Sequence, residues 1–149
     1  MSAPPEIEKA FQTTFKLIFG ECNVKLDELA DYLYRWHYPV IRKKSAVSGK
    51  ETIISSTFYQ DGAKFISNDE IDFVKKYEPF GINDIKDLDS IVEAIRERDL
   101  VYYSGNKVFG NSSNLHGVDN CTDVHYGYQS HNVASSKFVA YSSYVRYGS

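Results

Sequence analysis

A period of three residues governs the sequence from about Asn111 onward. Written in triplets from Asn114, it reads NLH GVD NCT DVH YGY QSH NVA SSK FVA YSS YVR YGS. An α-helix repeats about every 3.6 residues and a half-buried strand about every two, so the period fits neither. The middle residue of every triplet is small or apolar, and none is charged, amidated or aromatic. These residues are Leu115, Val118, Cys121, Val124, Gly127, Ser130, Val133, Ser136, Val139, Ser142, Val145 and Gly148.

The period fits a coil whose narrow axis takes one small side chain per step. A thin β-solenoid, with very short strands bent at frequent corners, meets this condition and is the structure that we predict. A polyproline-II-like bundle also turns every three residues, but it usually has glycine at the axis, where this chain has valine. In a solenoid, neighbouring coils pair the backbone groups, and the middle-register serines are packing residues rather than nucleophiles.

The end of this array raises the question of what covers it. A solenoid exposes its last coil unless a cap lies over it, and an exposed coil is a template for pairing. The residues YVRYGS contain no capping element. We therefore expect that the chain continues past Ser149 or that this end packs on another molecule, a second copy included. Tyr141, Tyr144 and Tyr147 are spaced by three residues, which predicts an aromatic ladder.

The ladder has two interpretations. It is a stack within the chain, or it is a binding face to which Tyr126 and Tyr128 also belong. Tyrosine supports both, because its ring can be buried while its hydroxyl stays in water.

Residues 1–100 show other periods. Apolar spacing predicts helices over residues 4–20, 24–36 and 87–100, with Trp36 in the core and Leu88 facing inward. Residues 67–70 match a capping box ahead of a further helix. Hairpins are predicted over residues 40–58 and over 100–110, the second turning at Gly105 and Asn106. The fold class is therefore α+β: a mixed helix and hairpin head over residues 1–100, and a β-solenoid-like module over 101–149.

The tail resembles a group of uncharacterised proteins. Its N-x-x and S-x-x-V units, as in NCTDVHYGYQSHNVASSKFVAYSSYVRYGS, are similar to the triplet arrays that follow a mixed α/β head in proteins of tailed bacteriophages and prophages. The resemblance covers roughly residues 100–149. It implies a phage or mobile-element origin and a host cytoplasm, and it implies no activity or active-site residue.

Composition narrows the function classes. A chain of 149 residues is long enough for one domain without disulfides, and a net charge of −3 gives no strongly basic field for non-specific binding to nucleic acid. Its two cysteines, Cys22 and Cys121, lie far apart in sequence, and the first residues show no apolar signal region. We expect a reducing cytoplasm, no membrane and no cofactor.

Candidate chemical sites are few. His116, Cys121, His125 and His131 have side chains that bind zinc, but their spacing matches no standard zinc motif, and Cys121 lies in the inward register. Surface histidines and a packed cysteine are the other interpretation. Motifs for nucleophilic catalysis and for phosphate binding are absent from the sequence. We therefore predict no catalytic residue.

A basic and aromatic segment, residues 35–50, is the candidate for nucleic acid. Cationic side chains there alternate with rings, which is how single-stranded nucleic acid is bound. The residues are Arg35, Trp36, Arg42, Lys43, Lys44 and Lys50.

Three functions remain open. The first hypothesis is a non-catalytic protein-interaction module, phage-encoded, that binds a host or phage protein and inhibits a defence or nucleic-acid enzyme. The second is a nucleic-acid-binding protein that uses residues 35–50. The third is a small zinc-binding protein.

Overall fold

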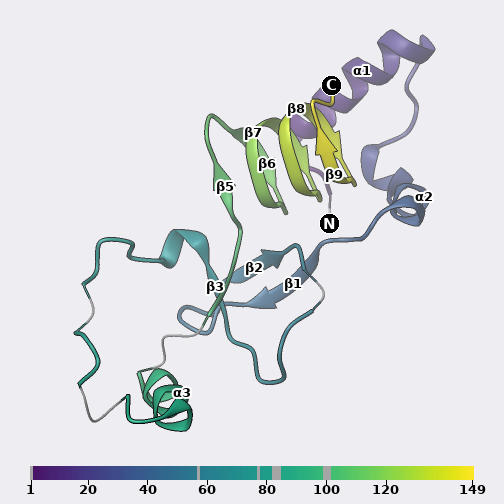
Figure 1. Cartoon of the computed structure of the whole chain (residues 1–149). Coiled ribbons are helices and arrows are strands. Elements are labelled where there is room, and N and C mark those ends of the chain that lie inside the picture. The colour runs from purple at the N-terminus through teal and green to yellow at the C-terminus, as the bar shows by residue number, and fades with distance from the viewer. Residues whose placement is uncertain (1, 57, 77, 82–84, 99–101) are drawn as a thin grey trace.

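The computed structural model describes residues 2–56, 58–76, 78–81, 85–98 and 102–149. Its fold is α+β, with a parallel β-solenoid at the C-terminal end (Figure 1). The helices are α1 (Pro5–Phe19), α2 (Ala30–Leu33) and α3 (Leu88–Glu97), with 3₁₀ turns at Leu26–Leu29, Tyr34–Trp36 and Asn68–Glu70. The strands are β1 (Ile41–Lys44), β2 (Glu51–Ile54), β3 (Phe65–Ser67), β4 (Tyr103–Gly105), β5 (Val108–Phe109), β6 (Ser113–His116), β7 (Asp119–Tyr128), β8 (His131–Ala140) and β9 (Ser143–Arg146).

The solenoid repeats every twelve residues. Asp119 pairs in parallel with His131, and His131 pairs with Ser143, so each coil contains four triplets. The first residue of every triplet from Asn114 to Tyr147 has a left-handed backbone, with φ between 47° and 63°. This conformation bends the chain, so each triplet forms one side of a coil with a corner at its first residue. The prediction of a thin β-solenoid is confirmed.

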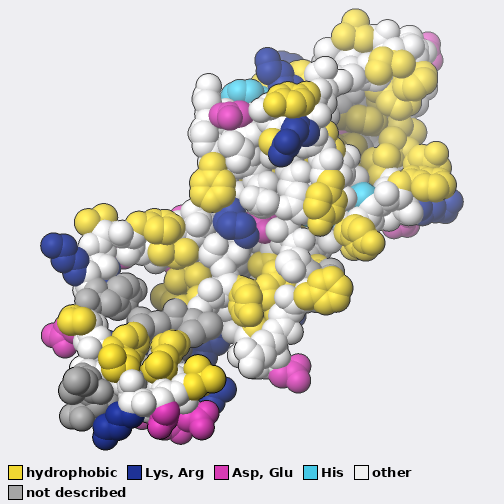
Figure 2. Space-filling view, viewed as in Figure 1, with side chains coloured by type: hydrophobic (Ala, Val, Ile, Leu, Met, Phe, Trp, Pro, Cys, Tyr) yellow, Lys and Arg dark blue, Asp and Glu magenta, His cyan; other side chains and the backbone are white. Residues whose placement is uncertain are grey.

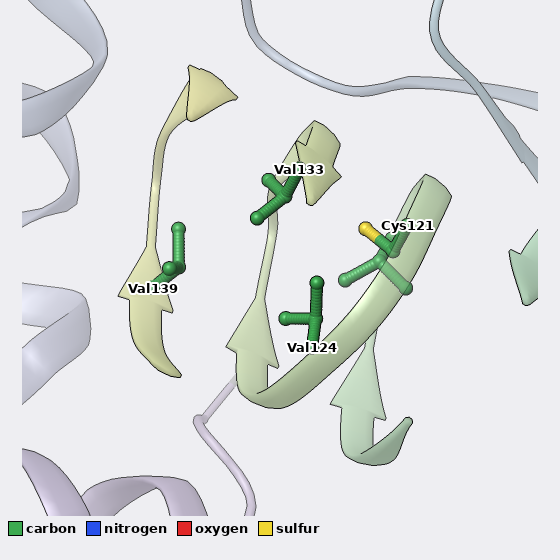
Figure 3. Close-up of a cluster of buried hydrophobic side chains, with 5 residues drawn as sticks. Cys121, Val124, Val133 and Val139 are labelled. Atoms are coloured by element: carbon green, nitrogen blue, oxygen red, sulfur yellow. The ribbon is translucent and has the colours of Figure 1, made fainter. Parts of the chain in front are cut away.

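The middle residues of the triplets line the axis. Cys121 and Val124 are fully buried, and Val133 and Val139 are nearly so. Their side chains point toward one another between the coils (Figure 3). None of the twelve middle residues is exposed, which explains why the sequence admits no charge or ring at these positions.

Serines in the same register connect the coils through their hydroxyls. The Ser130 hydroxyl donates to the Tyr128 carbonyl (2.8 Å) and accepts from the Ser142 amide (3.1 Å). Ser136 repeats the arrangement two sides further on, with the Ala134 carbonyl and the Gly148 amide. These serines satisfy backbone groups at the corners and are packing residues, as the sequence predicted.

Helix α1 forms as predicted, and it packs on the solenoid. Prolines occupy its start, and Gly20 ends it with a φ of 85°. Ile7 is buried against Leu26, Tyr128 and Tyr141. In Figure 1, α1 runs beside β7, β8 and β9. Toward its C-terminal end Leu17, Ile18 and Phe19 are exposed, and this region shows as an apolar surface in Figure 2.

The predicted helix over residues 24–36 is broken into a 3₁₀ turn, α2 and a second 3₁₀ turn. Leu26 and Leu33 pack on the solenoid beside Tyr34. Because the helix is not continuous, its apolar face does not extend to Trp36, whose side chain is 79% exposed. The prediction that Trp36 belongs to the core is wrong.

The predicted hairpin at Gly105 and Asn106 is also wrong. Strands β1 and β2 form the first predicted hairpin, but β4 pairs in parallel with β3, and β5 pairs in parallel with β7. Asn106 leads the chain from one sheet into the other. Its side chain accepts from the Ile53 amide (2.8 Å) and donates to the Glu51 carbonyl and to Ser67. These hydrogen bonds from Asn106 to β2 take the place of the predicted hairpin turn.

The capping box at residues 67–70 forms, but the described residues that follow it are not helical. The Glu70 carboxylate also accepts from Ser45 and Ser48, in the turn between β1 and β2, so it ties that turn to the 3₁₀ turn. Helix α3 forms as predicted and begins after Asp87, its N-terminal cap. Ala94 is buried but Leu88 is exposed, so the prediction that Leu88 faces inward is wrong.

The boundary that the sequence placed between residues 100 and 101 lies outside the described residues. Among the described helices, none combines the length and the apolar character needed to cross a bilayer.

Candidate binding groove

A groove lies between the solenoid and the open end of the β1–β2 hairpin, where the chain enters β1 and leaves β2, and it encloses about 440 Å³. Three side chains at its margin are strongly exposed for aromatic residues: Phe58 (90%), Tyr144 (70%) and Tyr38 (68%). They come from three segments that are distant in sequence, and we name this surface the aromatic groove. Its lining residues are Tyr38, Pro39, Ile41, Ser55, Ser56, Phe58, His131, Asn132 and Tyr144.

A chain of hydrogen bonds fixes the floor of the aromatic groove. The Asn120 amide donates to Asn132 Oδ1 (2.6 Å), and Asn132 Nδ2 lies 2.9 Å from His131 Nδ1. His131 Nε2 lies 2.8 Å from the Tyr38 carbonyl, which only accepts. His131 is therefore the neutral tautomer with its proton on Nε2, and its Nδ1 accepts from Asn132. This series of hydrogen bonds connects the segment before β1 to the solenoid.

The ring of His131 also holds the ring of Tyr144. The two rings pack edge to face, with centroids 5.9 Å apart and planes at 76°. His131 is 2% exposed, so its imidazole is a fixed support rather than a mobile surface group. The expectation that the tail histidines face water is wrong at this position.

The lining is electrically neutral, since none of the described residues that form it carries a full charge. The cations predicted to bind nucleic acid are mostly engaged elsewhere. Arg42 donates to Gln129 (2.6 Å) and lies 3.4 Å from Glu51, and Lys50 pairs with Asp69. The ammonium of Lys43 lies over the Phe65 ring. Lys44 is exposed.

Arg35 and Trp36 lie at the 3₁₀ turn before β1, and both are exposed. The guanidinium of Arg35 lies 5.9 Å from the centre of the Tyr32 ring. Arg35 and Trp36 are therefore accessible together, and Lys44 is exposed as well, while Arg42, Lys43 and Lys50 have partners.

The predicted tyrosines do not form one face. A coil has twelve residues, so Tyr141, Tyr144 and Tyr147 occupy three successive corners and point in different directions. Tyr141 is 5% exposed, while Tyr147 is 80% exposed. The Tyr141 hydroxyl donates to Asp27, and burial together with that carboxylate raises the pKa of Tyr141.

The other two predicted tyrosines lie on the outer side of the solenoid that faces α1. Tyr128 is buried against α1, with Ile7 and Leu26. Tyr126 stacks on Phe138, twelve residues later, with centroids 5.2 Å apart and planes at 16°. Aromatic stacking therefore follows the coil length rather than the triplet.

The four predicted metal-binding residues lie apart. His116 pairs with Glu6 (2.7 Å), His125 Nδ1 contacts the Ser113 hydroxyl (2.8 Å), and His131 supports the aromatic groove. Cys121 faces the axis, where burial raises the pKa of its thiol to about 11. Within the described ranges, no three His, Cys, Asp or Glu side chains are placed to share a metal ion.

Two other depressions on the described surface are weaker candidates for a binding site. One of about 90 Å³ lies under α1 and is lined by the apolar side chains that hold this helix to the solenoid. The other, of about 510 Å³, lies between residues 60–64 and α3 and has Asp61, Lys64 and Arg96 in its wall. Neither gathers exposed rings as the aromatic groove does.

Sequence reasoning missed most of the aromatic groove. Asn120, Asn132 and Tyr144 recur every twelve residues, and a search at this period, rather than at three, would have placed them in one column. Phe58 follows β2 without any pattern that marks it. Its role depends on the hairpin lying against the solenoid.

The imidazole of His37 lies behind the aromatic groove, 5.1 Å from the Tyr34 ring and 6.4 Å from the His131 ring, centre to centre. Burial lowers the pKa of His37 below its usual 6.5, an effect that the Tyr38 backbone opposes and His131 adds to. The unfolded chain then binds the proton more readily than the folded chain does. The stability from this group is therefore complete above pH 6.5 and declines as the pH falls below it.

We expect thermal melts of the wild type to show a lower midpoint at pH 5.5 than at pH 7.5, and His37→Phe to show a smaller difference. Carboxylates with lowered pKa, such as those of Asp69 and Glu70, titrate below this window. His125→Phe, at a partly exposed ring, serves as the control and should keep the wild-type difference. An unchanged difference in His37→Phe would show that another group is responsible.

Comparison with protein-family models, with curated proteins and with solved structures finds no match to this chain.

Proposed function

We propose that this chain is a non-catalytic protein-interaction module that binds its partner in the aromatic groove. The observation that carries the proposal is the convergence of Phe58, Tyr144 and Tyr38, all more than two-thirds exposed, on one neutral groove. Burying an exposed aromatic ring against a partner removes a large apolar surface from water and stabilises the complex. Aromatic residues accordingly contribute much of the binding free energy at protein interfaces. Tyr144 is the member of the predicted interaction face that lines this groove.

The setting and the target belong to the same proposal. The resemblance of the tail supports a phage-encoded protein that acts in a bacterial cytoplasm. A host defence or nucleic-acid enzyme is the class of partner that we propose.

Tyr144 and Tyr147 form a matched pair for the test. Both are exposed corner residues with nearly equal φ, 58° and 57°, and only Tyr144 lines the aromatic groove. A photoreactive benzoylphenylalanine at position 58 should crosslink a discrete protein in lysate of cells that naturally contain the chain. Tyr144→Ser should reduce the yield at least about tenfold, as expected for the loss of an aromatic anchor. Tyr147→Ser should leave it unchanged.

Equal yields in the two serine variants would contradict the placement of the interface. A photoreactive group at position 147 gives the background, because this corner is exposed and lies outside the groove lining.

Nucleic-acid binding is the second candidate, favoured by the accessible pair of Arg35 and Trp36. Labelled single-stranded DNA, titrated at two salt concentrations, tests it. Binding through phosphates weakens steeply with salt.

Self-association is a separate proposal. Strand β9 ends the sheet order, and no strand among the described residues pairs with its outer edge. Such an edge accepts a further strand. Sedimentation at increasing concentration tests whether two copies pair there.

A further inference from the structure

We infer that the occupant of the aromatic groove is a proline-rich segment of the partner in the polyproline II conformation. This inference rests on the proposed function, because it assigns a chemical class to the partner of that same site. Three properties of the groove carry it: its rings, its hydrogen-bond donors and its lack of charge.

The rings match the shape of such a segment. Polyproline II has three residues per turn and presents its pyrrolidine rings as ridges, which dock between aromatic side chains. Tyr38 and Phe58 lie at the open end of the hairpin, before β1 and after β2, and Tyr144 comes from the solenoid. Pro39 and Ile41 add apolar wall between the rings. The groove thus offers rings and apolar wall from both the hairpin and the solenoid.

The polar groups of the lining match a ligand that accepts hydrogen bonds. Asn132 accepts from Asn120 through Oδ1 and uses one amide hydrogen on His131, so its remaining polar hydrogen is a donor. Tyr38 and Tyr144 add phenolic hydroxyls, which donate to carbonyls. A proline-rich segment is rich in carbonyl acceptors and has no N–H at its prolines. These donors suit a chain whose carbonyls outnumber its N–H groups.

The aromatic groove is also neutral and rigid. A nucleic acid needs cations along its phosphates, and none of the described lining residues supplies one. The hydrogen bond from His131 to the Tyr38 carbonyl, and its contact with the Tyr144 ring, hold both sides of the groove in place. A polyproline II segment loses little entropy on binding because its conformation is already formed in water.

The test uses a fluorescein-labelled peptide of ten prolines and the full chain, followed by fluorescence anisotropy. A Gly-Ser peptide of the same length and a labelled oligothymidylate are titrated in parallel. We expect saturable binding of the proline peptide only. Tyr144→Ser and Phe58→Ser should each weaken it at least about fivefold, and Tyr147→Ser less than about twofold. Circular dichroism melts confirm that each variant is folded.

Three results would overturn the inference: no saturable binding of the proline peptide, equal affinity for the Gly-Ser peptide, or indifference of the affinity to the change at both groove positions. Groove-dependent binding of the oligothymidylate without binding of the proline peptide would replace it with the nucleic-acid function. If crosslinking at position 58 still captures a protein while the proline peptide does not bind, only the ligand class is wrong. Loss of both would reject the interaction function itself.

Discussion

Replacing Val124 with aspartate is expected to prevent the chain from folding. Val124 is fully buried in the solenoid axis, in one cluster with Val118, Cys121, Val133 and Val139; Figure 3 shows it beside Cys121 and Val133. A carboxylate there has no cation within the cluster, and burying it unpaired costs several kcal/mol or more. A domain of this size is stable by only about 5–15 kcal/mol. We expect loss of the folded far-ultraviolet circular dichroism signal and of soluble protein.

The matched control is Ser135→Asp. Ser135 is an exposed corner residue with a left-handed backbone, a conformation that aspartate tolerates. Its melting temperature should stay within about 3 °C of the wild type, since surface changes of this kind are worth about 0.5 kcal/mol or less. Val124→Thr keeps the shape and adds one hydroxyl, and it should fall between the two. A folded Val124→Asp protein with a wild-type melting temperature would show that the axis admits water.

Gly105→Ala is expected to give the second-largest loss of stability. Gly105 is the last residue of β4 and is buried against β2. An added methyl carbon would overlap the Ile53 carbonyl oxygen and lie 2.6 Å from Thr52 Cγ2 and 2.8 Å from Ile54 Cγ2. The neighbouring Asn106 binds both the amide and the carbonyl of Ile53 at 2.8 Å, so β2 cannot move aside easily.

We expect Gly105→Ala to lower the free energy of unfolding by about 3 kcal/mol, or roughly 6–12 °C in a thermal melt. Gly62→Ala is the control, because it makes the same chemical change at a site with nothing within 4 Å. Its φ of 76° alone should cost about 1 kcal/mol. If both variants lost the same stability, the joint between β2 and β4 would be looser than these contacts indicate.

The corners of the solenoid show how far the triplet pattern reaches. Asn114, Gly117, Asn120 and Asp123 open their triplets with residues that adopt the left-handed backbone readily. Five of the eight later triplets open with tyrosine or phenylalanine, which seldom take this conformation unaided. The coils beneath impose it, because the paired strands fix where each corner must lie. The triplet pattern in the sequence therefore predicted which residues line the axis. The backbone conformation at the corners is set by the stacking of the paired coils.

Helix prediction failed where contacts with other segments decided the outcome. The apolar spacing of residues 24–36 is helical, but Leu26, Leu33 and Tyr34 each find a place on the solenoid surface, and the segment bends to supply them. At residues 67–70 the capping box is intact, but Glu70 binds the hairpin turn. Local propensity is a small energy, and packing and buried hydrogen bonds outweigh it.

By itself, the sequence determined the solenoid, because a narrow axis repeats one local requirement at every third residue, and such a requirement is visible in the pattern. It also determined α1, the β1–β2 hairpin and α3, whose start and stop signals are local. Only the tertiary structure decided the aromatic groove. Tyr38, Phe58 and Tyr144 lie in segments that no period relates. They meet because His131 binds the Tyr38 carbonyl and Arg42 of β1 binds Gln129, which together fix the hairpin to the solenoid.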